Sequence, residues 1–264
     1  MSKKLEELTA FFNKQYRDQR DGQFLQGLQT AFLHKLKEYY GGRLPDHIFF
    51  ADDCFVVYRN LGFLSDEFFI NSVLEANPDP VLLGRIWRLW ILAWSMSSRW
   101  LVPGGIFVDC GTYNGQAFEI AIRYSKKRFG HIDHQLFAFD IFDQPPDEAR
   151  KVDHGPELYS RVSERLGRVG NCVTVQGMLP GVIEWPGEKT EISWCQIDLN
   201  SAEADISTFE KLLPMLMPGA MVIFDDYGFS RYSSTQTGID ALTQSYGSAV
   251  LELPTGQGLY IHRP

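Results

Sequence analysis

The chain has 264 residues, of which 44% are apolar and 14% aromatic, so it can bury a large core in one large domain or in a domain with a cap. Its formal net charge of −8 and sequence pI near 5.3 argue against nucleic-acid binding, because that needs a basic surface. The sequence lacks an apolar run of about 18 residues, and its first residues lack the apolar core of a signal peptide. These absences argue against a membrane partner and favour a cytoplasmic protein.

The first hundred residues read as mostly helical and form a predicted N-terminal cap or oligomerisation region, residues 1–100. Residues 3–40 carry apolar side chains at helical spacing, and Gly41-Gly42 ends that pattern. Ser65 is the expected N-cap of a short helix through Leu74, which the Asn-Pro-Asp-Pro sequence at 77–80 stops. We assign no element to residues 44–64.

A longer helix is expected over residues 81–100. Trp87, Trp90 and Trp94 fall at helical spacing along it, with Arg85 and Arg88 alongside. Such a stripe of tryptophans indicates core packing or a subunit interface, and the alternative is a platform for a ligand.

The stretch Gly105–Ile122 has the order strand, glycine turn, helix. Ile106 to Val108 is a short apolar run typical of a buried parallel strand, and Gly111 and Gly115 bracket the turn that follows. The helix N-terminus that comes next offers free N–H groups, and glycine lets the backbone approach a ligand closely. This order predicts a nucleotide-type pocket, although many strand–helix units need such a glycine for geometry alone.

From residue 101 to 264 strands and helices alternate, which predicts an α/β domain with a mostly parallel sheet. The closing segment reads as a β-hairpin, so the sheet should end in an antiparallel pair. Expected strands are 135–140, 173–176, 192–198 and 220–225, and expected helices are 146–166, 202–216 and 235–246. The four cysteines follow no metal-type spacing and are predicted to be buried free thiols: Cys54, Cys110, Cys172 and Cys195.

Acidic residues end several of these strands, at the edge where open α/β sheets bind ligands. Asp140 lies 25 residues after Gly115 and could accept both hydroxyls of a ribose, or it could cap the next segment. Asp198, Asp225 and Asp226 end two strands that, as neighbours, would bring the three carboxylates together. Because such carboxylates repel one another, they predict a divalent cation such as Mg²⁺ or Ca²⁺, with Asn200 as a neutral addition. The alternative is that the Asp pair binds only backbone amides and begins a turn.

Several segments together resemble a known family. The Asp109-x-Gly111-x-x-x-Gly115 motif resembles the first motif of class I S-adenosylmethionine-dependent methyltransferases, a Rossmann-like fold with a closing hairpin. More narrowly, the chain is similar to the macrocin-type sugar O-methyltransferases. The matching segments lie between about residue 80 and the end: Gly104 to Gly111, Ile197-Asp-Leu-Asn, Pro218 to Gly228 and Pro254 to Leu259. The first 75 residues match nothing in that family.

The resemblance implies specific roles for these residues. S-adenosylmethionine would be the cofactor, Asp198 would be both a Mg²⁺ ligand and the general base, and Asp225 and Asp226 would be the other ligands. The chain departs from the family after Asp198, where members commonly carry a second aspartate and a tyrosine-glutamate pair and this chain has Asn200 and Ser201. The candidate cofactor-binding residues are Asp109, Gly111, Tyr113, Gly115, Asp140, Gly177 and Met178.

The predicted function is methyl transfer to a hydroxyl of a small molecule or glycosyl group, by an enzyme that could also be a homo-oligomer. One alternative is an NAD(P)-dependent oxidoreductase, which would normally show GxGxxG where this chain has only Gly111 and Gly115. The other is a non-catalytic binding module with the same fold. The acceptor cannot be read from the sequence.

Overall fold

The structure is a computed structural model that describes residues 60–97, 104–130, 134–143, 155, 157–183 and 190–263, with scattered residues between 31 and 57. The chain divides into two compact units, residues 1–50 with 55–59, and residues 51–54 with 60–264. Strands β1 (Ile48–Ala51) and β2 (Cys54–Val57) form a two-stranded sheet. The helix predicted over 3–40 falls almost entirely outside the described residues.

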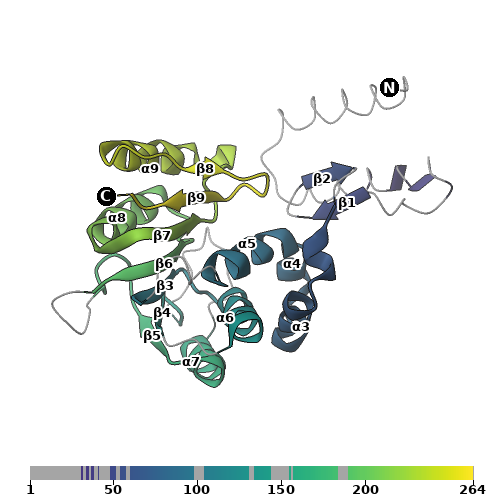
Figure 1. Ribbon diagram of the computed structural model, residues 1–264, viewed down its shortest axis with the longest axis horizontal. Coiled ribbons are helices and arrows are strands. Elements are labelled where there is room, and N and C mark those ends of the chain that lie inside the picture. Colours follow the sequence, from purple (N-terminus) through teal and green to yellow (C-terminus); the bar gives the residue numbers. More distant parts are fainter. Residues whose placement is uncertain are drawn as a thin grey trace. The chain divides into compact units, whose positions relative to one another are not determined.

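The larger unit is built on a mixed sheet of seven strands within the described part of the chain (Figure 1). The strand order is β5-β4-β3-β6-β7-β9-β8; neighbours are parallel from β5 to β7, whereas β9 runs antiparallel to both β7 and β8. This arrangement confirms the predicted α/β fold and its closing hairpin. The strands are β3 (Ile106–Cys110), β4 (Gln135–Asp140), β5 (Cys172–Gln176), β6 (Ile192–Ile197), β7 (Leu216–Phe224), β8 (Leu251–Glu252) and β9 (Gly258–Ile261).

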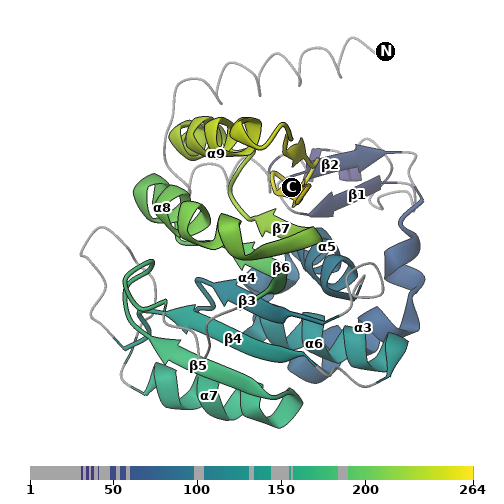
Figure 2. The same ribbon diagram turned by 60° about the vertical axis from the view of Figure 1, so that its left-hand side comes forward.

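Helices cover both faces of this sheet (Figures 1 and 2), with α5, α6 and α7 on one face and α8 and α9 on the other. The helices are α3 (Glu67–Ala76), α4 (Pro80–Leu83), α5 (Ile86–Ser97), α6 (Gln116–Phe129), α7 (Leu158–Val169), α8 (Ala202–Leu212) and α9 (Ser233–Ser245), with 3₁₀ turns η1 (Gly62–Ser65), η3 (Leu213–Met215) and η4 (Ser230–Tyr232). None of the helices in the described part of the chain has the length and apolarity that a membrane span requires.

The alternation of side chains along the central strands explains the two covered faces. Trp194 of β6 stacks on Phe118 of α6 at 5.9 Å between ring centroids, and its indole N–H donates to Ser95 of α5 at 2.9 Å. On the opposite face, Phe209 of α8 meets Phe224 of β7 edge-on at 4.9 Å. Cys110 and Cys195 are buried free thiols, as predicted, and Cys172 is a free thiol that is only partly buried.

The first helices differ from the prediction in their ends. Asp66, and not Ser65, caps α3, because its carboxylate accepts the N–H of Phe69 at 3.1 Å while Ser65 belongs to the preceding 3₁₀ turn. The single helix expected over 81–100 is two helices, α4 and α5, separated by Gly84 and Arg85. Glycine in a helix interior is costly, which favours a break there. Further along, α7 begins only at Leu158, and β7 begins at Leu216, four residues before the expected start.

Trp90 lies in an aromatic cluster and supports the core-packing interpretation of the tryptophan stripe. Its ring stacks on Phe63 at 5.9 Å and meets Phe69 and Tyr124 edge-on at 5.2 and 5.5 Å. Trp94, one turn later, is 42% exposed. These helices, α3 to α5, lie in the same compact unit as the sheet; the predicted functional division at residue 100 stays a prediction.

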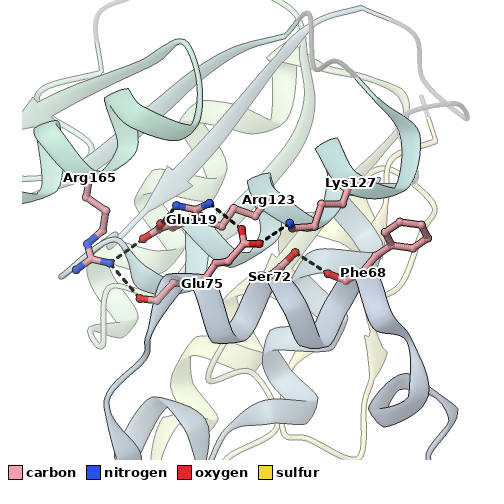
Figure 3. A network of polar contacts seen from close by, with 8 residues as sticks. Phe68, Ser72, Glu75, Glu119, Arg123, Lys127 and Arg165 are labelled. Atoms are coloured by element: carbon pink, nitrogen blue, oxygen red, sulfur yellow. Dashed lines mark hydrogen bonds and ion pairs between the residues drawn. The ribbon is translucent and has the colours of Figure 1, made fainter.

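A network of ion pairs joins α3 to α6 and α7 (Figure 3). Glu119 of α6 is buried and accepts from Arg165 of α7 at 2.7 Å and from Arg123 at 2.8 Å. Arg123 and Lys127 in turn donate to Glu75 of α3 at 3.0 and 2.7 Å. These pairs therefore hold α3 against α6, the helix that follows the glycine turn.

Candidate active site

The carboxyl ends of the central strands are aligned by their register. Cys110 of β3 pairs with Phe139 of β4 and with Ile197 of β6, and Ile197 pairs with Phe224 of β7. The next residues continue this alignment, since Asp198 donates its N–H to Cys110 at 2.8 Å and Asp225 donates to Ile197 at 3.1 Å. The predicted neighbourhood of the β6 and β7 ends is thus confirmed, and their first following residues stand about 5 Å apart.

The glycine turn after β3 lies directly against the end of β6. Gly111 has a φ of +90°, and a Cβ atom there would clash with the carbonyl group of Asp198, so both conformation and space require glycine. The N–H groups of Gly111 and Thr112 both donate to the carbonyl of Phe139, at 2.8 and 3.2 Å. Tyr113 follows with a φ of +49°.

The start of α6 is less open than the sequence predicts. Gly115 donates its N–H to Thr112 at 2.9 Å, and the N–H of Gln116 donates to the side chain of Asn114 at 3.1 Å. The turn therefore binds the N–H of the N-cap Gly115 and that of the first helical residue, Gln116. A Cβ atom on Gly115 would lie 3.1 Å from Val162 of α7, so this glycine also lets α7 pack closely.

Asp109, the acid that opens the first motif, is buried, and its Oδ1 has no hydrogen-bond partner within the described part of the chain. Burial raises the pKa of Asp109 to about 7, and the charges of Asp140 and Asp225 add to the rise while a hydrogen bond from Thr112 opposes it. A buried acceptor without a donor is costly. This oxygen therefore fits a cationic or hydrogen-bonding group of a ligand.

Asp140 is held in place by the backbone on both sides. Its Oδ2 accepts the N–H of Tyr113 at 2.7 Å, and its Oδ1 accepts the N–H of Phe142 at 2.9 Å. These two bonds fix the orientation of the carboxylate at the end of β4, where the predicted ribose contact would lie. The bond to the Phe142 N–H also agrees with the alternative prediction, in which Asp140 caps the following segment.

Gly177 and Met178 follow β5, beside Asp140. Gly177 donates its N–H to the carbonyl of Asp140 at 2.9 Å, and a Cβ atom there would clash with Val182. The side chain of Met178 is 69% exposed. An exposed apolar side chain at the ligand edge of the sheet is available to cover a flat ring.

Asp198 is partly buried and belongs to a short chain of polar side chains. Asn200 donates from its amide to Oδ1 of Asp198 at 3.0 Å, and the hydroxyl of Tyr232 donates to the amide oxygen of Asn200 at 3.0 Å. Burial raises the pKa of Asp198 well above its ordinary value, and the charges of Asp225 and Asp226 add to the rise. The positive charge of Arg85 acts in the opposite direction.

Asp225 is already paired with side chains of the protein. Its Oδ2 accepts from Arg88 of α5 at 2.7 Å, and its Oδ1 accepts from the amide of Gln257 at 3.1 Å. The ion pair is almost fully buried, with side-chain exposures of 7% for Arg88 and 8% for Asp225. Asp226 lies 3.9 Å from the same guanidinium nitrogen, and burial, with the charge of Asp225, raises its pKa to about 6.

These contacts do not fit the predicted Mg²⁺ site. A divalent ion on Asp225 would lie beside a buried guanidinium, and like charges that close repel strongly where water is excluded. Within the described ranges, no group of three or more His, Cys, Asp or Glu side chains is arranged to hold a metal ion.

Comparisons with solved structures find a similar fold in several methyltransferases. The O-methyltransferase NovP matches with a TM-score of 0.55 at 15% identity, over 68% of this chain and 81% of NovP. CalS11, a TDP-rhamnose 3'-O-methyltransferase, matches with a TM-score of 0.52 at 15% identity, over 78% of this chain and 96% of that one. The SAH-bound methyltransferase PaMTH1 of Podospora anserina matches with a TM-score of 0.50 at 11% identity, over 74% and 87%. This chain has the class I methyltransferase fold.

No protein-family model matches the chain, and no curated protein matches it either. The similarity therefore concerns the fold, and the residues at the strand ends decide what the class I methyltransferase fold does here.

Three residues of this site were missed from the sequence as functional candidates: Arg88, Gln257 and Tyr232. Arg88 offered a signal, because it is a charged residue within the otherwise apolar segment Ile86–Ala93, and such a residue is buried only with a partner. Gln257 and Tyr232 reach the site through the closing hairpin and through η4, and their neighbours depend on tertiary structure alone.

Proposed function

We propose that the chain is an S-adenosylmethionine-dependent O-methyltransferase whose acceptor is a hydroxyl group of a small molecule or glycosyl group. The observation that carries the proposal is the contact between the glycine turn and Asp198, because Gly111 is pressed against the backbone of that residue. A carboxylate beside a cofactor loop is the arrangement that a general base for an acceptor hydroxyl requires.

The residues around the glycine turn fit the cofactor. The Oδ1 of Asp109, which has no partner among the described residues, would receive its ammonium group, and the carboxylate of Asp140 would receive its ribose hydroxyls. The turn at Gly111 and Tyr113 would approach the cofactor through the backbone. Gly115, Gly177 and Met178 complete the candidate set. S-adenosylmethionine supplies an electrophilic methyl group, and the protein supplies orientation and charge.

Asp198 is the proposed base. One of its oxygens accepts from Asn200, which fixes the carboxylate and leaves the other oxygen to accept the acceptor's hydroxyl proton. A raised pKa makes the ionised carboxylate a stronger base near neutral pH. Tyr232 orients Asn200 by donating to its amide oxygen, so Tyr232 is a positioning residue.

The fold shared with these neighbours supports methyl transfer over the two alternatives, an NAD(P)-dependent oxidoreductase and a non-catalytic binding module. NovP and CalS11 are both O-methyltransferases, and CalS11 acts on a nucleotide-linked rhamnose; a sugar hydroxyl is therefore our first candidate acceptor. The oxidoreductase and the non-catalytic module are outcomes of the test below. Homo-oligomer formation and a cytoplasmic location stay predictions.

The test is isothermal titration calorimetry of the full-length chain with S-adenosylhomocysteine, S-adenosylmethionine and NAD(P)H. We expect binding of the two sulfur compounds alone, followed by methyl transfer in an assay with free sugars and nucleotide sugars. Binding of NAD(P)H instead would establish the oxidoreductase. Cofactor binding with no transfer to any hydroxylated acceptor, in wild type and Asp198→Asn alike, would favour the binding module.

A further inference from the structure

The acceptor side of the site contains a cation that belongs to the protein. The guanidinium of Arg88 donates to Asp225 at 2.7 Å and lies 3.9 Å from Asp226. We infer that Arg88 serves as the fixed cation of this site and takes the place of a divalent metal, so that the reaction of the proposed function proceeds without one.

Arg88 is held from several directions, which makes its displacement by a metal ion costly. Its Nε donates to the carbonyl of Thr255 at 3.2 Å, and its guanidinium lies 4.6 Å from the ring centroid of Phe229. Arginine stays charged at every physiological pH and stacks well on aromatic faces. The side chain therefore carries a permanent positive charge in one orientation.

The predicted metal ligand Asp225 is bound by a second side chain besides Arg88. Gln257, which is fully buried, donates to the second oxygen of Asp225 and accepts from the hydroxyl of Thr255 at 3.1 Å. Both residues come from the turn of the closing hairpin, whereas Arg88 comes from α5. Two separate elements, α5 and the hairpin turn, thus converge on Asp225, and each binds one of its carboxylate oxygens.

The negative charges of Asp225 and Asp226 also require a nearby positive group, which Arg88 provides. Asp225 and Asp226 would repel each other at the end of β7 in the absence of a positive group, and Arg88 faces both of them. Asn200 binds one oxygen of Asp198 at 3.0 Å, and the other oxygen is the one that the proposed function assigns to the acceptor hydroxyl. Arg88 is therefore a positioning residue that organises the acid pair beside the base.

The experiment is a titration of the full-length chain with Mn²⁺ alone. The electron paramagnetic resonance signal of the free ion measures how much Mn²⁺ is bound at each step. Wild type should show no saturable binding up to about 1 mM Mn²⁺. The variant Arg88→Gln removes the charge and keeps a hydrogen-bonding side chain; it should bind Mn²⁺ at least roughly tenfold more tightly than wild type. The matched control Arg88→Lys keeps the charge and should resemble wild type. The double variant Arg88→Gln/Asp225→Asn should lose the gained binding.

Two results would overturn the inference. One is stoichiometric, micromolar Mn²⁺ binding by wild type that Asp225→Asn abolishes. The other is equal Mn²⁺ affinity in wild type and in an Arg88→Gln protein that still binds S-adenosylhomocysteine. If Arg88→Gln does not fold, the wild-type titration decides: tight binding contradicts the inference, and its absence supports it. Because the titration contains neither cofactor nor acceptor, its outcome is independent of whether the proposed methyl transfer is found.

Discussion

Two groups of acidic residues at one edge of the sheet differ in whether the protein itself binds their buried carboxylate oxygens. In the cofactor half, formed by the ends of β3 and β4, Asp109 is buried with one oxygen unpartnered among the described residues. In the acceptor half, formed by the ends of β6 and β7, Asp225 is equally buried, yet both its oxygens are bound by Arg88 and Gln257.

The difference shows which half is prepared for a charged ligand. A buried carboxylate costs free energy unless a cation or donors compensate it. The protein provides that compensation for Asp225 through Arg88 and Gln257, whereas the Oδ1 of Asp109 has no donor among the described residues and would gain one from a bound molecule. The cofactor half therefore depends on its ligand, and the acceptor half is organised in advance.

The largest expected effect belongs to Asp198. Asp198→Asn keeps the shape of the side chain and removes the base, so the rate of methyl transfer should fall about 10²- to 10⁴-fold. Affinity for S-adenosylhomocysteine, measured by calorimetry, should stay unchanged because the cofactor half is intact. A variant with wild-type turnover would remove Asp198 as the base.

Breaking the internal ion pair should lower stability strongly. Arg88→Met leaves Asp225 buried without its cation, and this should reduce the free energy of unfolding by about 3–5 kcal/mol. Urea denaturation measures the loss. Asp225→Asn in the Arg88→Met background is the control, and it should recover part of the stability; a loss as small as that of a surface pair would contradict the buried, paired geometry.

Asp109 should control cofactor affinity and its pH dependence. Asp109→Asn removes a charged hydrogen bond worth about 1.5–3 kcal/mol, so the affinity for S-adenosylhomocysteine should fall roughly 10- to 100-fold at pH 8. Because the pKa of Asp109 is raised to about 7, the carboxyl is protonated below that pH, and wild-type affinity should rise between pH 6 and pH 8. Calorimetry across this range should give a flatter profile for the variant.

The raised pKa of Asp109 also determines how the stability of the ligand-free protein changes with pH. A carboxyl whose pKa is higher in the folded than in the unfolded chain stabilises the fold at low pH, and this contribution is lost as pH rises toward 7. The unfolding free energy of wild type should therefore fall relative to Asp109→Asn between pH 5 and pH 7. Parallel stability curves for the two proteins would argue against a buried, unpaired carboxylate.

The smallest effect is expected for the surface part of the ion-pair network. Lys127 pairs with Glu75 at 2.7 Å, and the glutamate side chain is 45% exposed. Exposed pairs contribute about 0–1 kcal/mol, so Lys127→Ala should change the unfolding free energy by no more than that in urea denaturation. A loss comparable with Arg88→Met would mean that burial does not explain the difference between these pairs.

The sequence by itself determined the sheet and its ligand edge. Strand β4 has the predicted bounds, and β5 and β6 differ by a single residue at one end, because buried parallel strands are short apolar runs with recognisable ends. The same pattern predicted that Asp140, Asp198 and Asp225 end strands, and parallel strands bring such residues to one edge. The closing hairpin was predicted from its turn residues for an equally local reason.

Only the tertiary structure decided how those acids are compensated. Arg88 precedes Asp225 by 137 residues, and Gln257 follows it by 32, so no local pattern connects them. From the sequence, we predicted that the carboxylates repel one another and that a divalent metal ion balances their charge. The fold offers a guanidinium from a neighbouring helix instead, since packing α5 against the sheet brings that side chain to the end of β7.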